Sequence, residues 1–378
     1  MERYNWTAII RKNIFVLGLV GLWPKGTQKY GFNLYTAHAI VTITLFGFTQ
    51  SLFQTILLLT NLNDVEIVTG IAFLSISEML VVLKMFYLAR NVQTFKRLLI
   101  TLNGDLFQPK NKEQVDLASP SFKLWNLMYK MLWCSINVAI VFWSLVPFID
   151  KSIKDHNLPF LSWYPFNAKT SPFFEISYVH QTLSICFITS VNVNLDTLIA
   201  AFMMYTGAQL DILSDNLRNL EGENFEEELV RCVNHHREII KFTRSFNDAF
   251  NWTIFVQFFA SAISIGFSMF LMSTTSPLNK EFYSILFYGT SAFLEILIYC
   301  WFGNEVQMKN TNVPIKMYEC NWVEASRKNA KELLFFMMVA QRPLTVSALN
   351  LFELSLENFL KILKSAWSYF ALVSQLIE

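Results

Sequence analysis

The chain has 378 residues, of which 53% are hydrophobic and only 16% are charged, and its formal net charge is +1. A soluble protein of this length would carry about 25% charged residues, and the near-zero net charge gives no support for binding to nucleic acid. Because several apolar runs reach the roughly 20 residues that a helix needs to cross a bilayer, the composition predicts an all-α membrane protein.

The N-terminal segment, residues 1–33, contains a basic lead followed by a short apolar run, RKNIFVLGLVGLWPKG (Arg11–Gly26). This pattern is similar to a signal peptide, but it has no small-x-small cleavage site and ends in Trp23-Pro24. We therefore expect a cytoplasmic segment whose short helix lies on the membrane surface, with Trp23 at the level of the lipid headgroups.

Seven apolar segments are candidates for transmembrane helices. They are residues 34–60, 65–88, 124–148, 175–206, 250–272, 282–302 and 344–377. Most lysine and arginine residues between them lie in loops on the same side of the membrane as the N-terminus. The loops on the opposite side hold only Lys151, Lys154, Lys169 and Lys280. The positive-inside rule therefore predicts a cytoplasmic N-terminus and an extracellular C-terminus, the reverse of a G-protein-coupled receptor. The first six spans together cover residues 34–302.

Two of the connecting loops have a pattern of their own. The outer loop 149–174 is rich in proline and aromatic residues, and we expect it to be ordered. The loop 207–247 has leucines at helical spacing on both sides of Glu221-Gly222, which predicts cytoplasmic extensions of two spans joined by an acidic turn. Within it, His235-His236 is surrounded by charged residues and is expected to be solvated.

The C-terminal region begins with a cytoplasmic loop and an anchor helix, residues 303–343, which Pro343 ends because proline cannot continue a helix. A separate membrane helix is expected over residues 344–378. Its polar residues follow a helical spacing with one apolar gap at Leu372, in the order Asn350, Glu353, Glu357, Lys361, Lys364, Ser368, Gln375. One face of a helix would carry this stripe, either as a seam packed against the chain's own bundle or as the lining of a pore between copies.

Several polar residues fall inside the other predicted spans. For Glu78, Lys84, Asn192, Asn194 and Asp196 we expect hydrogen bonds between helices, since unpaired polar groups are costly in a bilayer. Glu295 stays open between a structural and a ligand-binding role. We find no nucleophile, metal-ligand set or phosphate-binding loop in the sequence, which argues against an enzyme. A secondary transporter would need paired broken helices and an internal repeat, and neither is visible.

The C-terminal part of the chain also carries the motifs of a known family. They are YCWFGNEV (Tyr299–Val306), the spaced Tyr318 and Trp322, and AQRPLTVSALNLFELSLENFLKILKSAWSYFALVSQL (Ala340–Leu376), which includes Ser368-Tyr369-Phe370 and Gln375-Leu376. With these motifs and the inverted seven-span plan, the chain resembles the insect odorant receptors.

This resemblance implies an odour-gated, non-selective cation channel in the cell membrane of sensory neurons, a tetramer in which an odour-tuning subunit assembles with a shared co-receptor. It favours the tuning subunit, because the 207–247 loop lacks the long insertion typical of the co-receptor. The expected partners are that co-receptor, membrane lipid and a small neutral volatile, with no cofactor and no metal. The alternative is a channel similar to the sister gustatory receptors, working as homotetramers, although these usually end in a Thr-Tyr…Gln-Phe pattern.

The resemblance also implies site residues. The last helix lines the pore in this family and apolar residues near its outer end close it, which here selects Ser368, Leu372, Gln375 and Leu376. The odorant pocket lies among the spans in the outer half of the bundle. The candidates there are Ala72, Phe73, Ile76, Ile136, Ala139, Trp143, His180, Ser184, Ile188, Tyr288 and Ser291. Trp143 and Tyr288 are the favoured pair, and for any single candidate ordinary helix packing explains the residue equally well.

Overall fold

The computed structural model describes residues 3–26, 30–149, 152–222, 224–276 and 280–377, and this part of the chain is predominantly helical. Its α-helices are α1 (Arg11–Leu19), α2 (Leu34–Thr42), α3 (Thr49–Thr60), α4 (Val65–Leu102), α5 (Lys112–Ile149), α6 (Phe173–Arg218), α7 (Phe225–Thr274), α8 (Lys280–Tyr318), α9 (Arg327–Ala340) and α10 (Leu356–Ile377). A π-helical stretch, Ile43–Phe48, joins α2 to α3. Short 3-10 turns cover Trp6–Ala8, Asp105–Phe107, Ser152–Asp155 and Trp322–Glu324, and two short strands are β1 (Ser347–Ala348) and β2 (Phe352–Glu353).

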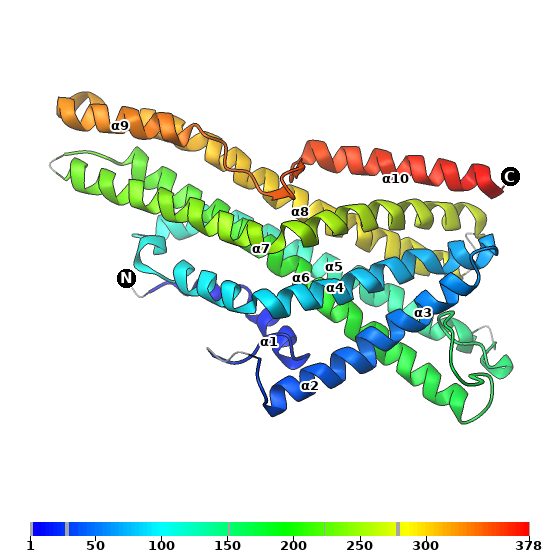
Figure 1. The fold of residues 1–378 in the computed structure, drawn as a ribbon. Coiled ribbons are helices and arrows are strands. Elements are labelled where there is room, and N and C mark those ends of the chain that lie inside the picture. The colour runs from blue at the N-terminus through cyan, green and yellow to red at the C-terminus, as the bar shows by residue number, and fades with distance from the viewer. Residues whose placement is uncertain (1–2, 27–29, 150–151, 223, 277–279, 378) are drawn as a thin grey trace.

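The long helices α4 to α8 form a bundle, and α9 and α10 follow one another along one edge of it (Figure 1). The centre of the bundle is α6, which packs against α5, α7 and α8. Every residue of α6 from Val191 to Leu210 is buried, whatever its polarity. A helix with neighbours on all sides must satisfy its polar side chains within the protein, and α6 therefore organises the polar contacts described below.

Six helical segments of the described chain are long and apolar enough to cross a membrane. They are Leu34–Thr60, Gly70–Leu102, Lys112–Ile149, Phe173–Arg218, Phe225–Thr274 and Glu281–Tyr318. Each of them overlaps one of the first six predicted spans, as a multi-pass helical membrane protein requires. The 50 residues of α7 extend for about 75 Å, far more than a hydrocarbon core of about 30 Å. The part of α7 before residue 250, outside the predicted span, therefore continues beyond the membrane.

The expected helix over residues 344–377 is wrong in its first part. Residues 347–353 form a hairpin in which Ser347 pairs with Glu353 and Ala348 with Phe352, and the helix α10 begins only at Leu356. The turn places Leu349 and Asn350 in the left-handed region, with φ of 51° and 57°. Asparagine tolerates this conformation, and the strand pairing satisfies the backbone that Pro343 prevents from continuing α9. Asn350 and Glu353 therefore do not belong to the helical polar stripe.

The hairpin is seated against α7 and α8. The backbone N–H of Ser347 donates to Asn247 Oδ1 of α7 at 3.0 Å. On α8, Gly303 lets Leu354 approach so closely that a Cβ atom at this position would lie 2.3 Å from Leu354 Cβ. The start of α10 is thus fixed by contact with the bundle rather than by local sequence alone.

We expect Gly303→Ala to destabilise the protein, because the added methyl group must displace the Leu354 backbone. Overpacking of this kind costs about 1–3 kcal/mol, which would lower the thermal unfolding midpoint of the purified protein in detergent by several degrees. The matched control is Gly70→Ala on α4, where an added Cβ meets no atom within 4 Å. Equal midpoints for the two variants would show that the hairpin is not tightly seated.

The N-terminal segment packs into the protein. Asn13 of α1 donates to Thr197 Oγ1 at 2.7 Å, and Tyr205 of α6 donates to the carbonyl of Trp6 at 2.7 Å. Trp23 is only 8% exposed, so its expected position among lipid headgroups is wrong. Helix α1 packs against α6 through a face that includes the buried Asn13 and Leu17. Burial of the Trp23 indole within the protein removes more apolar surface from water than an interfacial position would.

The outer loop is attached to the bundle through its backbone. Gln181 of α6 accepts from the N–H of Phe160 at 3.1 Å and donates to the carbonyl of the same residue at 2.9 Å. The N–H of Trp163 donates to the carbonyl of Phe53 on α3 at 3.2 Å. These contacts agree with the prediction of an ordered loop for its described residues, and they hold the loop over the end of the bundle where the candidate site lies.

The expectation that His235-His236 is solvated is wrong, since the two residues are 3% and 4% exposed. Gln209 of α6 donates to the carbonyl of Phe107 at 3.1 Å, so its Oε1 atom is left to accept from His235 Nε2 at 3.0 Å. Both histidines lie in the part of α7 outside the predicted span. Burial lowers the pKa of His235 to about 3, because the charged imidazolium would lose its hydration without gaining an anionic partner.

This buried neutral histidine predicts a loss of stability in acid. Below the unfolded-state pKa of about 6.5 the unfolded chain binds a proton at this position and the folded chain does not, so the free energy of unfolding falls by up to about 1.4 kcal/mol per pH unit between pH 6.5 and 3. Thermal unfolding midpoints between pH 7.5 and 5.5 should fall less steeply in His235→Gln. His38→Gln, at an exposed position, should keep the wild-type slope, and identical slopes in all three proteins would contradict the assignment.

Candidate ligand pocket and pore helix

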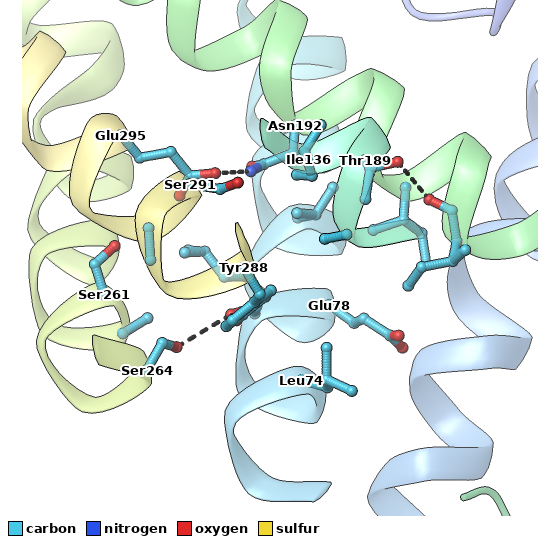
Figure 2. A pocket seen from close by; sticks show the side chains of 18 of the residues that line it. Leu74, Glu78, Ile136, Thr189, Asn192, Ser261, Ser264, Tyr288, Ser291 and Glu295 are labelled. Carbon is cyan, nitrogen blue, oxygen red and sulfur yellow. Dashed lines mark hydrogen bonds between the residues drawn. The ribbon is translucent and has the colours of Figure 1, made fainter. Parts of the chain in front are cut away.

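Helices α4, α5, α6, α7 and α8 enclose a small cavity in the half of the bundle nearer to the outer loop. Figure 2 shows apolar side chains such as Leu74 and Ile136 next to polar ones such as Glu78, Ser264 and Glu295. The cavity volume is about 60 Å³. Since one water molecule in the liquid takes up about 30 Å³, the side chains must move apart before a larger ligand can enter.

Six of the eleven predicted pocket residues line this cavity: Ile136, Ala139, Trp143, Ile188, Tyr288 and Ser291. The rings of the favoured pair, Trp143 and Tyr288, lie 5.8 Å apart and form part of one wall. Trp143 also lines an adjoining hollow of about 470 Å³ under the outer loop, together with Leu74. These two side chains therefore separate the small cavity from a larger space next to it.

The other predicted pocket residues lie beside the cavity or away from it. Phe73 packs edge-on against Tyr288, with ring centroids 5.0 Å apart, and lines the adjoining hollow. His180 faces the first span instead, with Nε2 2.8 Å from the carbonyl of Leu45, and Ser184 lies 3.4 Å from the same ring nitrogen. Ala72 and Ile76 line neither space.

On α4 the predicted residues are rotated relative to those that line the cavity. The residues of α4 that reach the cavity follow helical spacing, and they are Leu74, Ser77, Glu78 and Val81, with Leu80 beside them. Ala72 and Ile76 occupy the neighbouring face, whereas Phe73 lies one turn before Ser77 on the cavity side and lines the adjoining hollow. An apolar helix surrounded by other helices carries no amphipathic signal that would identify the face toward the pocket, so only the packing could make this choice.

Helix α7 contributes a wall for which the sequence analysis named no residue. Gln257, Ala260, Ser261 and Ser264 reach the cavity at steps of three, one and three residues, which is one helical face. Small and polar residues at this spacing inside an apolar run are the signal that could have revealed them. The Ser77 hydroxyl links this wall to the others, lying 2.6 Å from the Tyr288 hydroxyl and 3.2 Å from Ser264 Oγ.

Glu295 of α8 closes the inner end of the cavity and has a donor for each carboxyl oxygen. Asn192 of α6 donates to Oε1 at 2.6 Å, and Gln257 of α7 donates to Oε2 at 2.8 Å. One carboxyl group thus joins three helices. Its contacts support a structural role over direct ligand binding, because both oxygens are engaged.

The same network continues to a buried ion pair. Lys84 of α4 lies 2.6 Å from Asp196 Oδ1 and 2.7 Å from Asn192 Oδ1, and Tyr299 donates to Asp196 Oδ1 at 2.6 Å. The side chains of Lys84 and Asp196 are 1% and 0% exposed. The expectation of interhelical bonds is confirmed for Lys84, Asn192 and Asp196. It is wrong for Glu78, whose oxygens have no hydrogen-bond partner among the described residues. Asn194 instead bonds within α6, donating to the carbonyl of Ser190 at 2.8 Å.

We expect Lys84→Met to destabilise the protein strongly, because Asp196 would stay buried without its counter-charge. Breaking a buried pair on one side costs about 3–5 kcal/mol, whereas replacing both partners by apolar residues is often close to neutral. The double variant Lys84→Met, Asp196→Leu should therefore recover much of the surface expression and thermal stability that the single variant loses. A double variant less stable than Lys84→Met alone would contradict this account.

Helix α10 exposes its polar stripe. The described residues at the predicted positions are all exposed: Glu357, Lys361, Lys364, Ser368, Leu372 and Gln375. The opposite face is buried on α7 and α8, with Phe359 7% and Ala366 0% exposed. The interpretation of the stripe as a seam packed against the chain's own bundle is therefore wrong. The side chain of Leu376, the last predicted gate residue, lies outside the described residues.

The contact between α7 and α10 is close at one point. A Cβ atom on Gly266 of α7 would lie 2.9 Å from the carbonyl oxygen of Ala366 and 2.9 Å from Tyr369 Cβ. Gly266 follows Ser264, which lines the cavity, by two residues. A single segment of α7 therefore contacts the cavity on one side and α10 on the other.

A bundle of membrane-length helices around an enclosed, mainly apolar cavity defines a multi-pass membrane protein with an internal cavity. A family model described as "7tm Odorant receptor" matches residues 65–367 of the chain. The chain is 22% identical to Odorant receptor Or1 of Anopheles gambiae, over 98% of this chain and 97% of that protein. It is 25% identical to Odorant receptor 13a of Drosophila melanogaster, over 94% and 93%.

The solved structure of the insect olfactory receptor OR5 from Machilis hrabei, in complex with eugenol, has the same fold, with a TM-score of 0.88, 17% sequence identity and coverage of 99% of this chain and 100% of that one. The chain belongs to the insect odorant receptor family. Members of this family are ligand-gated channels and not enzymes.

Proposed function

We propose that this chain is an odour-tuning subunit of a non-selective cation channel in the cell membrane of sensory neurons. It would assemble with a shared co-receptor into a heterotetramer, with its N-terminus in the cytoplasm and its C-terminus outside. A small volatile would bind in the cavity among α4 to α8, and α10, as the seventh span, would line the pore. The observation that carries this proposal is the exposed polar face of α10.

The dimensions and the surface of α10 support a pore-lining role. Its 22 residues extend for about 33 Å, which matches the hydrocarbon core of about 30 Å. Polar residues at this depth must face protein or water, and the chain's own bundle covers only the opposite face. Four subunits around an axis would turn these faces toward a common aqueous path, with Leu372 and Leu376 as an apolar constriction that closes by excluding water.

The ends of α7 and α9 support assembly outside the membrane. Together they form a groove of about 1030 Å³, whose lining includes Val230, Val233 and Phe335. Val230 is 51% and Phe335 is 69% exposed. Exposed apolar patches of this kind mark contact sites between proteins, as expected for the anchor helices of a tetramer. The charge distribution of the sequence supports a cytoplasmic position for this end of the bundle.

The two spaces next to Trp143 support binding of a small molecule. Displacement of Trp143 and Leu74 would join the cavity to the adjoining hollow of about 470 Å³, which is within the range of small-molecule sites. The shared segment of α7 then offers a path to the gate. A ligand that pushes against Ser261 and Ser264 would shift α7 at Gly266, where it touches α10.

The test separates gate from pocket in cells that express the chain with its co-receptor. We expect odour-evoked cation currents only when both chains are present. Leu372→Ala should raise the basal current or alter gating, because a smaller side chain weakens the constriction, and it should keep the rank order of active odours. Trp143→Ala should shift the effective concentrations of individual odours by about tenfold or more, and so change their rank order. It should leave the basal current unchanged.

Three results would count against this assignment. The first is a complete lack of current with a broad odour panel despite surface expression, and the second is full activity without the co-receptor. In the third, Leu372→Ala would change odour selectivity and Trp143→Ala would change basal current. A tag at Met1 that is accessible from outside the intact cell would overturn the orientation.

A further inference from the structure

Glu78 is a buried carboxyl group in the cavity wall without a partner. It is 2% exposed and lies on the cavity-facing side of α4. Within the described residues, no donor reaches hydrogen-bond distance of Oε1 or Oε2. Gln50 of the first span is fully buried and lies near enough to interact with the carboxyl group. Its amide atoms nevertheless stay beyond hydrogen-bond distance of Glu78 and of every other described group. Such groups are costly unless something supplies the missing contact.

Most other polar groups in the wall are already engaged. Both oxygens of Glu295 have donors, the Tyr288 hydroxyl donates to the carbonyl of Phe73 at 3.2 Å, and Ser291 donates to that of Phe287 at 2.8 Å. Gln257 uses its amide N–H groups toward Glu295 and Ser261, while its Oε1 atom has no partner among the described residues. The wall groups that lack a hydrogen-bond partner are thus mainly acceptors, namely the oxygens of Glu78 and Gln257.

We propose that Glu78 is a specificity-determining residue which selects ligands that carry an O–H or N–H donor, that is, small apolar alcohols or amines. The inference rests on the proposed function of this cavity and adds the chemical class of its ligand. A carboxyl group offers at least one acceptor oxygen whether or not it carries a proton. A ligand with a donor therefore supplies what the wall lacks. An ether of the same size leaves this acceptor unpaired even when a protonated carboxyl donates to the ether oxygen, and a hydrocarbon makes neither contact.

The position of Glu78 gives this contact a direction. Figure 2 shows Glu78 on one side of Tyr288 and Glu295 on the other. Apolar residues that line the same cavity include Leu74, Val81 and Ile140. A ligand would place its hydrocarbon part against these residues and its hydroxyl or amino group toward the carboxyl. Sites that hydrogen-bond a ligand hydroxyl reject analogues without it more strongly than apolar pockets reject an added group.

The experiment compares isomers that differ only in the donor. Purified protein is titrated with straight-chain alcohols of four to eight carbons, with the methyl ethers isomeric with these alcohols, and with primary amines of the same chain lengths. Ligand-induced stabilisation is read as the shift of the thermal unfolding midpoint. We expect the ethers to need on the order of tenfold higher concentrations than the alcohols or amines. In Glu78→Leu this ratio should fall to about one, while Glu78→Gln, which keeps an acceptor oxygen, should retain most of the preference for the donor.

The matched control is Glu175→Leu, which removes an exposed carboxylate at the start of α6 and should leave the ratio unchanged. Ethers as effective as alcohols in the wild type, or no stabilisation by any alcohol or amine, would overturn the inference. So would an unchanged ratio in Glu78→Leu, which would mean that Glu78 is paired within the protein. Donor-selective stabilisation without any evoked current in co-receptor-expressing cells would support the inference and overturn the proposed channel function.

Discussion

The buried ion pair between Lys84 and Asp196 is the contact around which the membrane helices are arranged. It joins α4 to α6 at a depth where neither side chain reaches solvent, and Tyr299 adds α8 through the same carboxylate. A bilayer offers no alternative partner for such groups, so the helices must meet in the arrangement that pairs them. Helix α6 therefore lies at the centre of the bundle, with buried residues on all its faces.

The cavity lies directly beside this network and takes its inner end from it. Asn192 contacts Lys84 on one side and Glu295 on the other, so a single side chain connects the ion pair to the cavity wall. The floor is therefore rigid, whereas the outer side is formed by Trp143 and Leu74 next to a larger hollow. A site built in this way can widen toward the outer loop while its inner contacts stay in place. Among the described residues of the wall, this arrangement leaves the carboxyl oxygens of Glu78 and Oε1 of Gln257 unpaired.

The polar face of helix α10 also needs partners in a membrane, and these must come from outside the single subunit. Its apolar face is buried on α7 and α8, and the face that carries Lys361, Lys364 and Ser368 has no partner within the described chain. Both this face and the apolar groove between α7 and α9 are surfaces that a single subunit leaves uncovered. Our proposal of a tetrameric channel rests on the requirement that such surfaces face other subunits or water when the protein is in a membrane.

The sequence by itself determined the class of the protein, the first six spans and the polar stripe of the last helix, because these follow from hydropathy and periodicity along one chain. It also indicated six residues of the cavity, including Trp143 and Tyr288. The cavity-facing side of α4, the wall from α7, the burial of His235 and the hairpin before α10 were decided only by tertiary structure. A helix with neighbours on every side has no amphipathic pattern to mark its orientation, and a contact such as that between Gly303 and Leu354 exists only once distant segments have been brought together.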